Sequence, residues 1–224
     1  MSTPRLIRIL VFASAALAAG AVAAIPASAS KSAPELQPQA LVRAKAIRTN
    51  VNARYRRLPG RKLAVTEVTS MGVVDSVSLI VDLLEPARVV SAENGIYFAL
   101  CTVGARCPHP PRSAAWSATA FRPRRQALEL AVQAFAQTAA SLVVVALPTW
   151  SPTWVVFERD DLSKEIGAPL RAQLAADPRF ADAGLRAAVD ELTLWRTFVP
   201  LGIEEVAPGH ETFLALTLFE RSGK

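Results

Sequence analysis

Histidine and cysteine are scarce in this sequence, with two of each among 224 residues. The chain also lacks the G-x-S-x-G nucleophile turn, the H-E-x-x-H metal pair, a glycine-rich phosphate loop and the dinucleotide-binding fingerprint. Its ten glycines are scattered. These absences exclude the enzyme classes that such motifs identify. We therefore predict no catalytic residue, no metal site and no cofactor, and we favour a binding protein over an enzyme.

Charge is missing from residues 9–25, which follow two arginines near the start of the chain. Residues 27–29, Ala-Ser-Ala, then give the small-x-small pattern that a signal peptidase cleaves. The apolar run is slightly shorter than the roughly 20 residues that cross a bilayer. We predict a signal peptide over residues 1–29, cleaved after Ala29, and a secreted or extracytoplasmic protein. An uncleaved N-terminal membrane anchor is the alternative.

Acidic residues are almost absent from residues 30–62, where Glu35 is the single acid against nine basic residues. The basic residues are Lys31, Arg43, Lys45, Arg48, Arg54, Arg56, Arg57, Arg61 and Lys62. We interpret this segment as a basic arm that precedes a separate body over residues 63–224. Such an arm is attracted to an anionic envelope surface or an acidic protein partner, and outside the cytoplasm we expect no nucleic acid.

The arm has one helical stripe of apolar residues, formed by Ile47, Val51, Tyr55 and Leu58. Pro59 and the glycine after it predict the end of this helix. The simplest interpretation is that the stripe packs on the body of the protein. Docking of the stripe to a membrane or a partner is the alternative, because basic residues flank it.

The body alternates between strand-like and helix-like segments. Strands are predicted within residues 62–68, 73–84, 87–103, 114–121, 141–148, 153–161, 196–206 and 212–220, and helices within 122–140, 161–176 and 181–195. This order does not repeat a β-α-β unit. It predicts an α+β fold in which helices pack on one face of a mainly antiparallel sheet. Asn94-Gly95, between two strand-like runs, predicts a tight hairpin with both residues at positive φ.

Both cysteines lie close together, at Cys101 and Cys107. In an exported chain a disulfide is the default for such a pair, and a loop this short gains about 2 kcal/mol from it. Zinc binding with His109 and His210 is an alternative, although the spacing is loose for a structural zinc site. Cys107-Pro108-His109 also resembles the start of the C-P-H-C centre of periplasmic thiol oxidants, but the resolving cysteine is missing here.

Four arginines surround the start of the helix predicted after residue 121: Arg112, Arg122, Arg124 and Arg125. Positive charge is unfavourable at a helix N-terminus, so these residues suggest an anion-binding site. Pairing of one arginine with Glu129 and solvation of the others explain these residues more simply.

Two carboxylates, Glu158 and Asp160, alternate at the end of a predicted strand. They are the candidate residues for the alternative function, a secreted hydrolase, which could otherwise use a solitary histidine. Solvation of the strand end and capping of the next helix explain them more simply. Trp150 and Trp154 could stack on a sugar, but Trp154 opens an apolar strand and is expected in the core.

Taken together, these patterns predict an exported cell-envelope or secreted protein that binds an anionic ligand or partner.

Overall fold

The computed structural model describes residues 38–59, 62–72, 74–81, 86–102, 115–176, 178–179, 182–205 and 212–219. The helices are α1 (Pro38–Tyr55), α2 (Phe121–Gln137), α3 (Arg159–Glu165), α4 (Ala168–Ala175) and α5 (Ala183–Leu194). The strands are β1 (Leu63–Ser70), β2 (Ser76–Ile80), β3 (Arg88–Ser91), β4 (Gly95–Thr102), β5 (Leu142–Ala146), β6 (Trp154–Glu158), β7 (Thr197–Glu205) and β8 (Thr212–Leu218).

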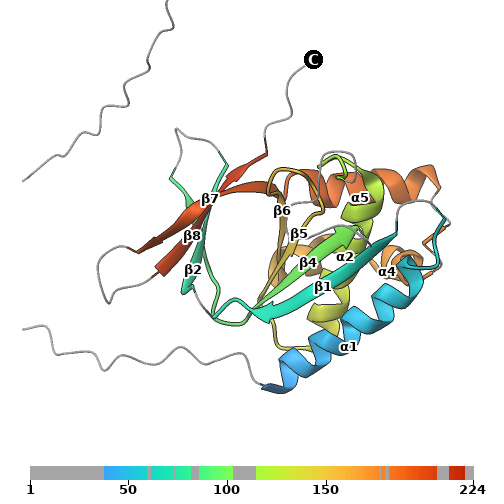
Figure 1. Ribbon diagram of the computed structural model, residues 1–224, viewed down its shortest axis with the longest axis horizontal. Helices are drawn as coiled ribbons and strands as arrows, with labels where there is room; N and C mark the ends of the chain where they lie inside the picture. Colours follow the sequence, from blue (N-terminus) through green and yellow to red (C-terminus); the bar gives the residue numbers. More distant parts are fainter. Residues whose placement is uncertain are drawn as a thin grey trace, which may run out of the picture. The chain divides into compact units, whose positions relative to one another are not determined.

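These strands form one sheet in the order β1-β4-β5-β6-β7-β8-β2-β3 (Figure 1). The pairs β4–β5 and β2–β8 are parallel, and the other five pairs are antiparallel. The predicted α+β class with a mainly antiparallel sheet is therefore confirmed. The predicted final hairpin is also present, as the antiparallel pair β7–β8.

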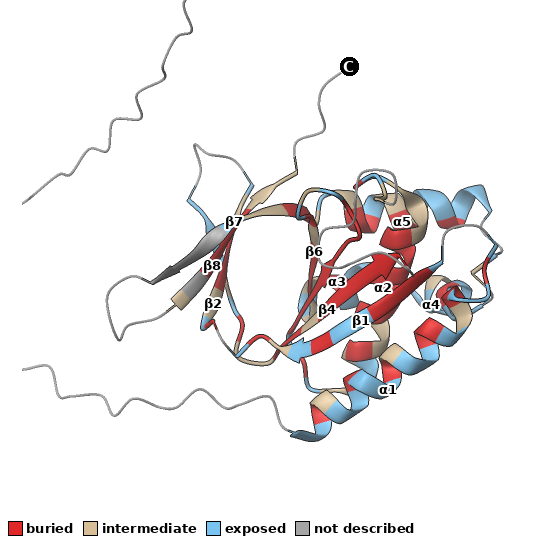
Figure 2. Cartoon of the chain, in the orientation of Figure 1, coloured by how far each residue is buried: buried red, intermediate tan, exposed pale blue. Residues whose placement is uncertain are grey.

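The helices cover one face of β1, β4, β5 and β6. All five helices contribute buried residues to a single hydrophobic cluster, which includes Phe98 of β4 and Phe157 of β6. The opposite face of β5 and β6 packs against β2 and β8, in a second cluster that contains Val144, Leu79 and Leu216. Because β5 has neighbours on both faces, all five of its residues are buried, as its continuous apolar run predicts (Figure 2).

Helix α1 belongs to this domain and is not a separate arm. Its apolar stripe, Ile47, Val51, Tyr55 and Leu58, is at most 3% exposed and lies in the same hydrophobic cluster as the core strands. The side chain of Asn52 fixes the helix to β1, since its amide donates to the carbonyl of Val65 at 2.9 Å and accepts from the Val65 amide at 2.6 Å. The stripe is therefore unavailable as a surface for docking to a membrane or a partner.

The expected hairpin at Asn94-Gly95 does not form. A turn is present, but it leads the chain from β3, which pairs with β2, into β4, which lies between β1 and β5. Gly95 is not at positive φ, and its role is a close approach. A Cβ atom at this position would lie 2.8 Å from the Cβ of Met71 and 2.9 Å from the carbonyl oxygen of Ala92. Glycine is thus required by crowding instead of by turn geometry.

A second expectation, a strand over residues 114–121, is also wrong for the part that the structure describes. Residues 115–120 form an irregular segment with a turn, and α2 begins directly after it. The helix predicted within residues 161–176 is divided into α3 and α4 around Gly167, which is the N-cap residue of α4. Asp182 caps α5, because its side chain accepts a hydrogen bond from the amide of Leu185 at 2.7 Å.

Candidate functional site

The arginine cluster predicted at the start of α2 is engaged inside the protein. Arg125 is 1% exposed, and its Nη1 donates to the hydroxyl of Tyr55 at 2.6 Å and lies 3.5 Å from Oε2 of Glu129. Its Nη2 donates to carbonyl oxygens at the end of α4, including those of Gln173 at 3.2 Å and Leu174 at 3.3 Å. Arg125 therefore joins three helices and offers no open guanidinium face to a ligand.

Glu129 is the acid at the centre of this cluster. Its carboxylate is 2% exposed, and it accepts hydrogen bonds from Tyr55 at 3.1 Å and from Gln133 at 3.1 Å. Arg54 of α1 also pairs with it and donates to the carbonyl of Ala175 at 2.8 Å. Burial raises the pKa of Tyr55 to about 12, so the phenol is neutral at physiological pH. Burial also lowers the pKa of Arg54.

Arg124 and Arg122 point to other partners. Arg124 is 2% exposed and donates to Asp190 at 2.5 Å and to the hydroxyl of Thr193 at 2.9 Å, both on α5. Arg122 donates to the carbonyl of Pro59 at 3.1 Å. Arg122, Arg124 and Arg125 therefore do not converge on one pocket, which corrects the expected anion site. Arg112 lies outside the described residues.

The carboxylates of the alternative hydrolase site are separated by their partners. Glu158 and Asp161, not Asp160, share one arginine, because Nη2 of Arg88 lies 2.7 Å from Glu158 and 2.8 Å from Asp161. The hydrogen bond from Arg88 lowers the pKa of Asp161, whereas burial raises that of Glu158. Asp160 is exposed and lines a different cavity, beside Ser163. Through Arg88, Glu158 and Asp161 therefore connect β3 to β6 and α3.

Cys101 is buried at the end of β4 and does not carry a free thiol. Its expected disulfide partner, Cys107, lies outside the described residues, as do His109 and His210. The Cys101–Cys107 bridge accordingly stays a prediction. The described residues include no group of three or more histidine, cysteine or acidic side chains that could hold a metal ion.

The two tryptophans of the predicted aromatic pair separate. Trp154 is partly buried and packs against the second hydrophobic cluster, with its ring 5.7 Å from that of Tyr97 in an edge-to-face arrangement. Trp150 is 56% exposed. Trp154 is therefore at the edge of the core and not inside it, as its partial burial shows.

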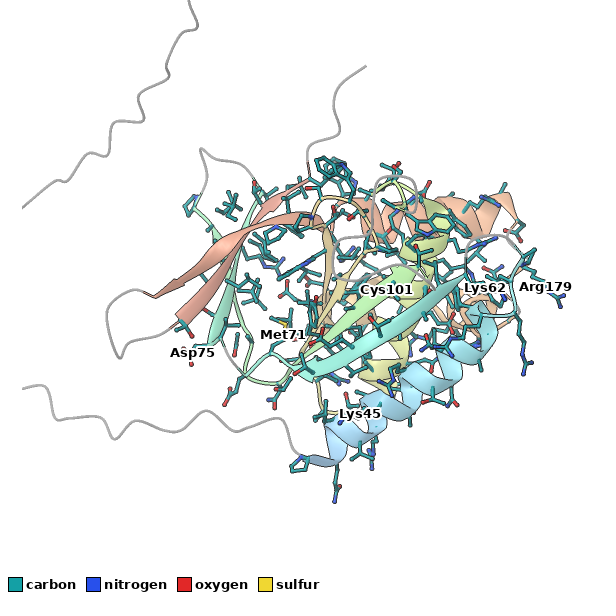
Figure 3. The ribbon with its side chains drawn as sticks, viewed as in Figure 1. Lys45, Lys62, Met71, Asp75, Cys101 and Arg179 are labelled. Carbon is teal, nitrogen blue, oxygen red and sulfur yellow. The ribbon has the colours of Figure 1, made fainter. Side chains whose placement is uncertain are left out.

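The charged surface of α1 emerges as the strongest candidate site. The stripe turns inward, and basic residues lie on the flanks and the outer side of the helix and on the segment after it, with no acid anywhere in residues 36–66. The partly or fully exposed basic residues are Arg43, Lys45, Arg48, Arg54, Arg56, Arg57 and Lys62. We call this surface the basic face of α1; Figure 3 labels Lys45 near one end of the helix and Lys62 beyond the other.

A cavity of about 350 Å³ lies at the C-terminal end of the basic face. It is lined by Arg54, Arg57 and Leu58 from one side and by Pro178 and Arg179 from the segment after α4. Three guanidinium groups around one cavity suit an anion, since arginine binds carboxylate and phosphate groups through several N–H donors. The contribution of Arg179 was missed from the sequence, because it is more than 100 positions from Arg57 and forms no local motif.

No family model, no curated protein and no solved structure matches this chain. Within the described ranges, no helix is both long enough and apolar enough to cross a membrane. The signal peptide expected over residues 1–29 lies outside those ranges.

Proposed function

We propose that this protein is an exported, non-catalytic domain of the cell envelope that binds an anionic ligand or partner. The binding surface is the basic face of α1 together with the arginine-lined cavity at its C-terminal end. The observation that carries this proposal is the position of Arg57 and Arg179 across one cavity, on a surface where α1 supplies cations and no acids.

The burial of the apolar stripe supports this orientation. With Ile47 and Val51 fully buried, α1 cannot turn its charged side away from solvent. The exposed charges on this face are therefore held on a rigid helix, which gives them fixed spacing. A surface of this kind attracts polyanions through many weak contacts, and the attraction falls as salt screens it.

The cavity adds selectivity to this general attraction. Arg54, Arg57 and Arg179 line this cavity together, and no acidic residue is among its described lining residues. A phosphate or carboxylate group that enters the cavity would meet more than one guanidinium group at once. The site is therefore expected to prefer clustered negative charge over a single isolated carboxylate.

Vesicle binding tests the proposal with a matched pair of double variants. The mature protein is sedimented with phosphatidylglycerol vesicles and with phosphatidylcholine vesicles over a series of salt concentrations. Lys45→Gln/Arg57→Gln removes one lysine and one arginine from the basic face. Lys164→Gln/Arg171→Gln removes the same two charges from exposed positions on α3 and α4.

We expect salt-sensitive binding of the unmodified protein to the anionic vesicles only, at least about tenfold weaker binding of the basic-face variant, and little change in the control. Equal losses in both variants would reject the assigned face. If the unmodified protein binds neither the anionic vesicles nor a soluble polyglutamate, the proposed function itself is wrong. Binding to polyglutamate alone would assign the surface to an acidic protein partner.

A further inference from the structure

A second cavity lies at the junction between the two parts of the sheet, away from the basic face of α1. It has a volume of about 150 Å³ and opens where β1, β4, β6 and β8 approach one another. Its walls include Ser70, Met71, Val74, Tyr97, Trp154 and Leu214. Figure 3 shows Met71 beside the gap between the β1–β4 part of the ribbon and the β2–β8 part.

The lining is apolar and aromatic. Val74 and Leu214 are at most 4% exposed, and both belong to the hydrophobic cluster that fills the inside of the curled sheet. Tyr97 and Trp154 meet edge to face, with their ring planes at 64°. Aromatic rings prefer offset or edge-to-face neighbours, so this pair gives a further ring a surface of suitable geometry.

The size of the cavity limits its occupant. An enclosed apolar cavity of about 150 Å³ accepts benzene, so a cavity of this volume has room for a single six-membered ring. Met71 is flexible and adapts its shape to an apolar neighbour. A mainly apolar cavity with an adaptable wall favours an aromatic ring over an ion or a sugar.

The side chain of Tyr97 limits how polar a ligand of this cavity can be. Burial raises its pKa to about 12, so its phenol is neutral throughout the physiological range. Tyr97 is only partly buried. An anionic substituent would have to lose solvent beside this neutral and mainly apolar wall, which is unfavourable.

We propose that this cavity is a binding site for a single uncharged aromatic ring, carried by a small molecule. The proposal is independent of the anionic ligand assigned to α1, because it rests on different residues and on the opposite chemistry. The two sites could be occupied together, since neither cavity shares a lining residue with the other.

Toluene is the probe, with benzoate as its charged analogue. Methyl resonances of Val74, Met71 and Leu214 are followed by carbon–proton correlation NMR during a titration of the full-length mature protein. Val74→Phe fills the cavity from a buried position, and Ser70→Leu fills it from a partly exposed position with less risk to folding. Val89→Phe makes the same substitution as the first variant at a site that is 64% exposed on β3.

We expect saturable shifts of these methyl groups with toluene and at least about tenfold weaker binding of benzoate. Toluene should also raise the melting temperature of the unmodified protein, because a ligand that binds only the folded state stabilises it. The shifts and the thermal stabilisation should be lost in Ser70→Leu and in folded Val74→Phe, and kept in Val89→Phe.

Two results would overturn the proposal. Toluene shifts that rise linearly without saturation would show non-specific partitioning, and saturable binding that survives both filling variants would place the ring elsewhere. If Val74→Phe does not fold, Ser70→Leu alone decides the outcome. Failure of this test leaves vesicle binding by the basic face unaffected, so the two proposals can fail separately.

Discussion

The hydroxyl oxygen of Tyr55 lies 2.6 Å from Nη1 of Arg125, and this contact joins α1 to α2 in the interior of the protein. Both side chains are at most 1% exposed, and the nearby carboxylate of Glu129 balances the arginine charge. Buried charges are tolerated only when they are paired and hydrogen-bonded. The free energy of unfolding should therefore depend strongly on this cluster.

Replacement of Glu129 by glutamine should destabilise the protein strongly. The variant leaves Arg125 buried without a compensating charge, and removal of one partner from a buried pair costs about 3–5 kcal/mol. The free energy of unfolding is measured by urea titration. Glu191→Gln, the same substitution at an exposed position of α5, is the control and should change it by less than about 0.5 kcal/mol. Similar values for the two variants would contradict the role assigned to Glu129.

Tyr55→Phe should lower the free energy of unfolding by about 1–3 kcal/mol, because Arg125 and Glu129 each lose a buried hydrogen-bond partner. The ring remains, so packing is preserved. Thermal unfolding at neutral pH provides the measurement. A variant as stable as the unmodified protein would show that water replaces the hydroxyl.

The stability of the fold should fall at alkaline pH. The chain has two tyrosines, and burial raises the pKa of both, Tyr55 and Tyr97, from 10.0 to about 12. The unfolded state therefore loses these protons first, and the stability present below pH 10 is lost as the pH rises toward 12. For the buried Tyr55 the slope is up to about 1.4 kcal/mol per pH unit.

An absorbance titration of the phenolates near 295 nm checks this prediction. The native protein should show little phenolate at pH 10, whereas the protein in concentrated guanidinium chloride should be half ionised there. Half ionisation of either tyrosine at pH 10 in the native state would contradict the burial assigned to it.

Arg88→Gln should change two pKa values in the same direction. Its guanidinium hydrogen bond lowers the pKa of Asp161, and its charge opposes the effect of burial on Glu158. Both carboxyl pKa values should therefore rise in the variant, as measured by carbon-detected NMR of the side-chain carboxyls. The loss of stability should stay below about 1 kcal/mol, because Arg88 is 55% exposed. An unchanged pKa of Asp161 would show that the ion pair is absent in solution.

Gly95→Ala should destabilise the protein by about 1–3 kcal/mol, because the new methyl group meets the backbone carbonyl of Ala92, which cannot move aside easily. Gly184→Ala is the matched control. There the nearest atom is Oδ1 of Asp182 at 3.4 Å, and alanine favours the helix. Melting temperatures should fall for the first variant and stay level or rise for the second. A level melting temperature for Gly95→Ala would show that β4 can shift away from Met71.

Local patterns were sufficient to predict the fold class and most of the helices and strands. The continuous apolar run of β5 and the stripe of α1 each depend on the pattern within one segment, and the hairpin β7–β8 pairs two strands that are neighbours in sequence. Pairing between distant segments was not visible. Asn94-Gly95 has the composition of a hairpin turn, but β3 and β4 take other neighbours in the sheet, and composition does not report those neighbours.

The site was less predictable for the same physical reason. Arg124 and Arg125 were expected to be open to an anion. Their partners could not be identified from the sequence, because Asp190 is 66 positions from Arg124 and Tyr55 is 70 positions from Arg125. The segment's positive charge was visible in the sequence, but the cavity needs Arg179, which the fold brings to Arg57. Charge could be counted from sequence, whereas its pairing required the tertiary structure.

The parallel pairing of β2 with β8 has a consequence for how the chain acquires its structure. The amide of Thr212 donates to Asp75 at 2.7 Å across 137 positions, and β8 joins β2 and β3 to the rest of the sheet. Until β8 has been synthesised, β2 and β3 have no stable place to dock. Proteins dominated by such long-range contacts fold slowly. We expect nascent chains that end before β8 to expose the apolar side of β2 and to depend on chaperones.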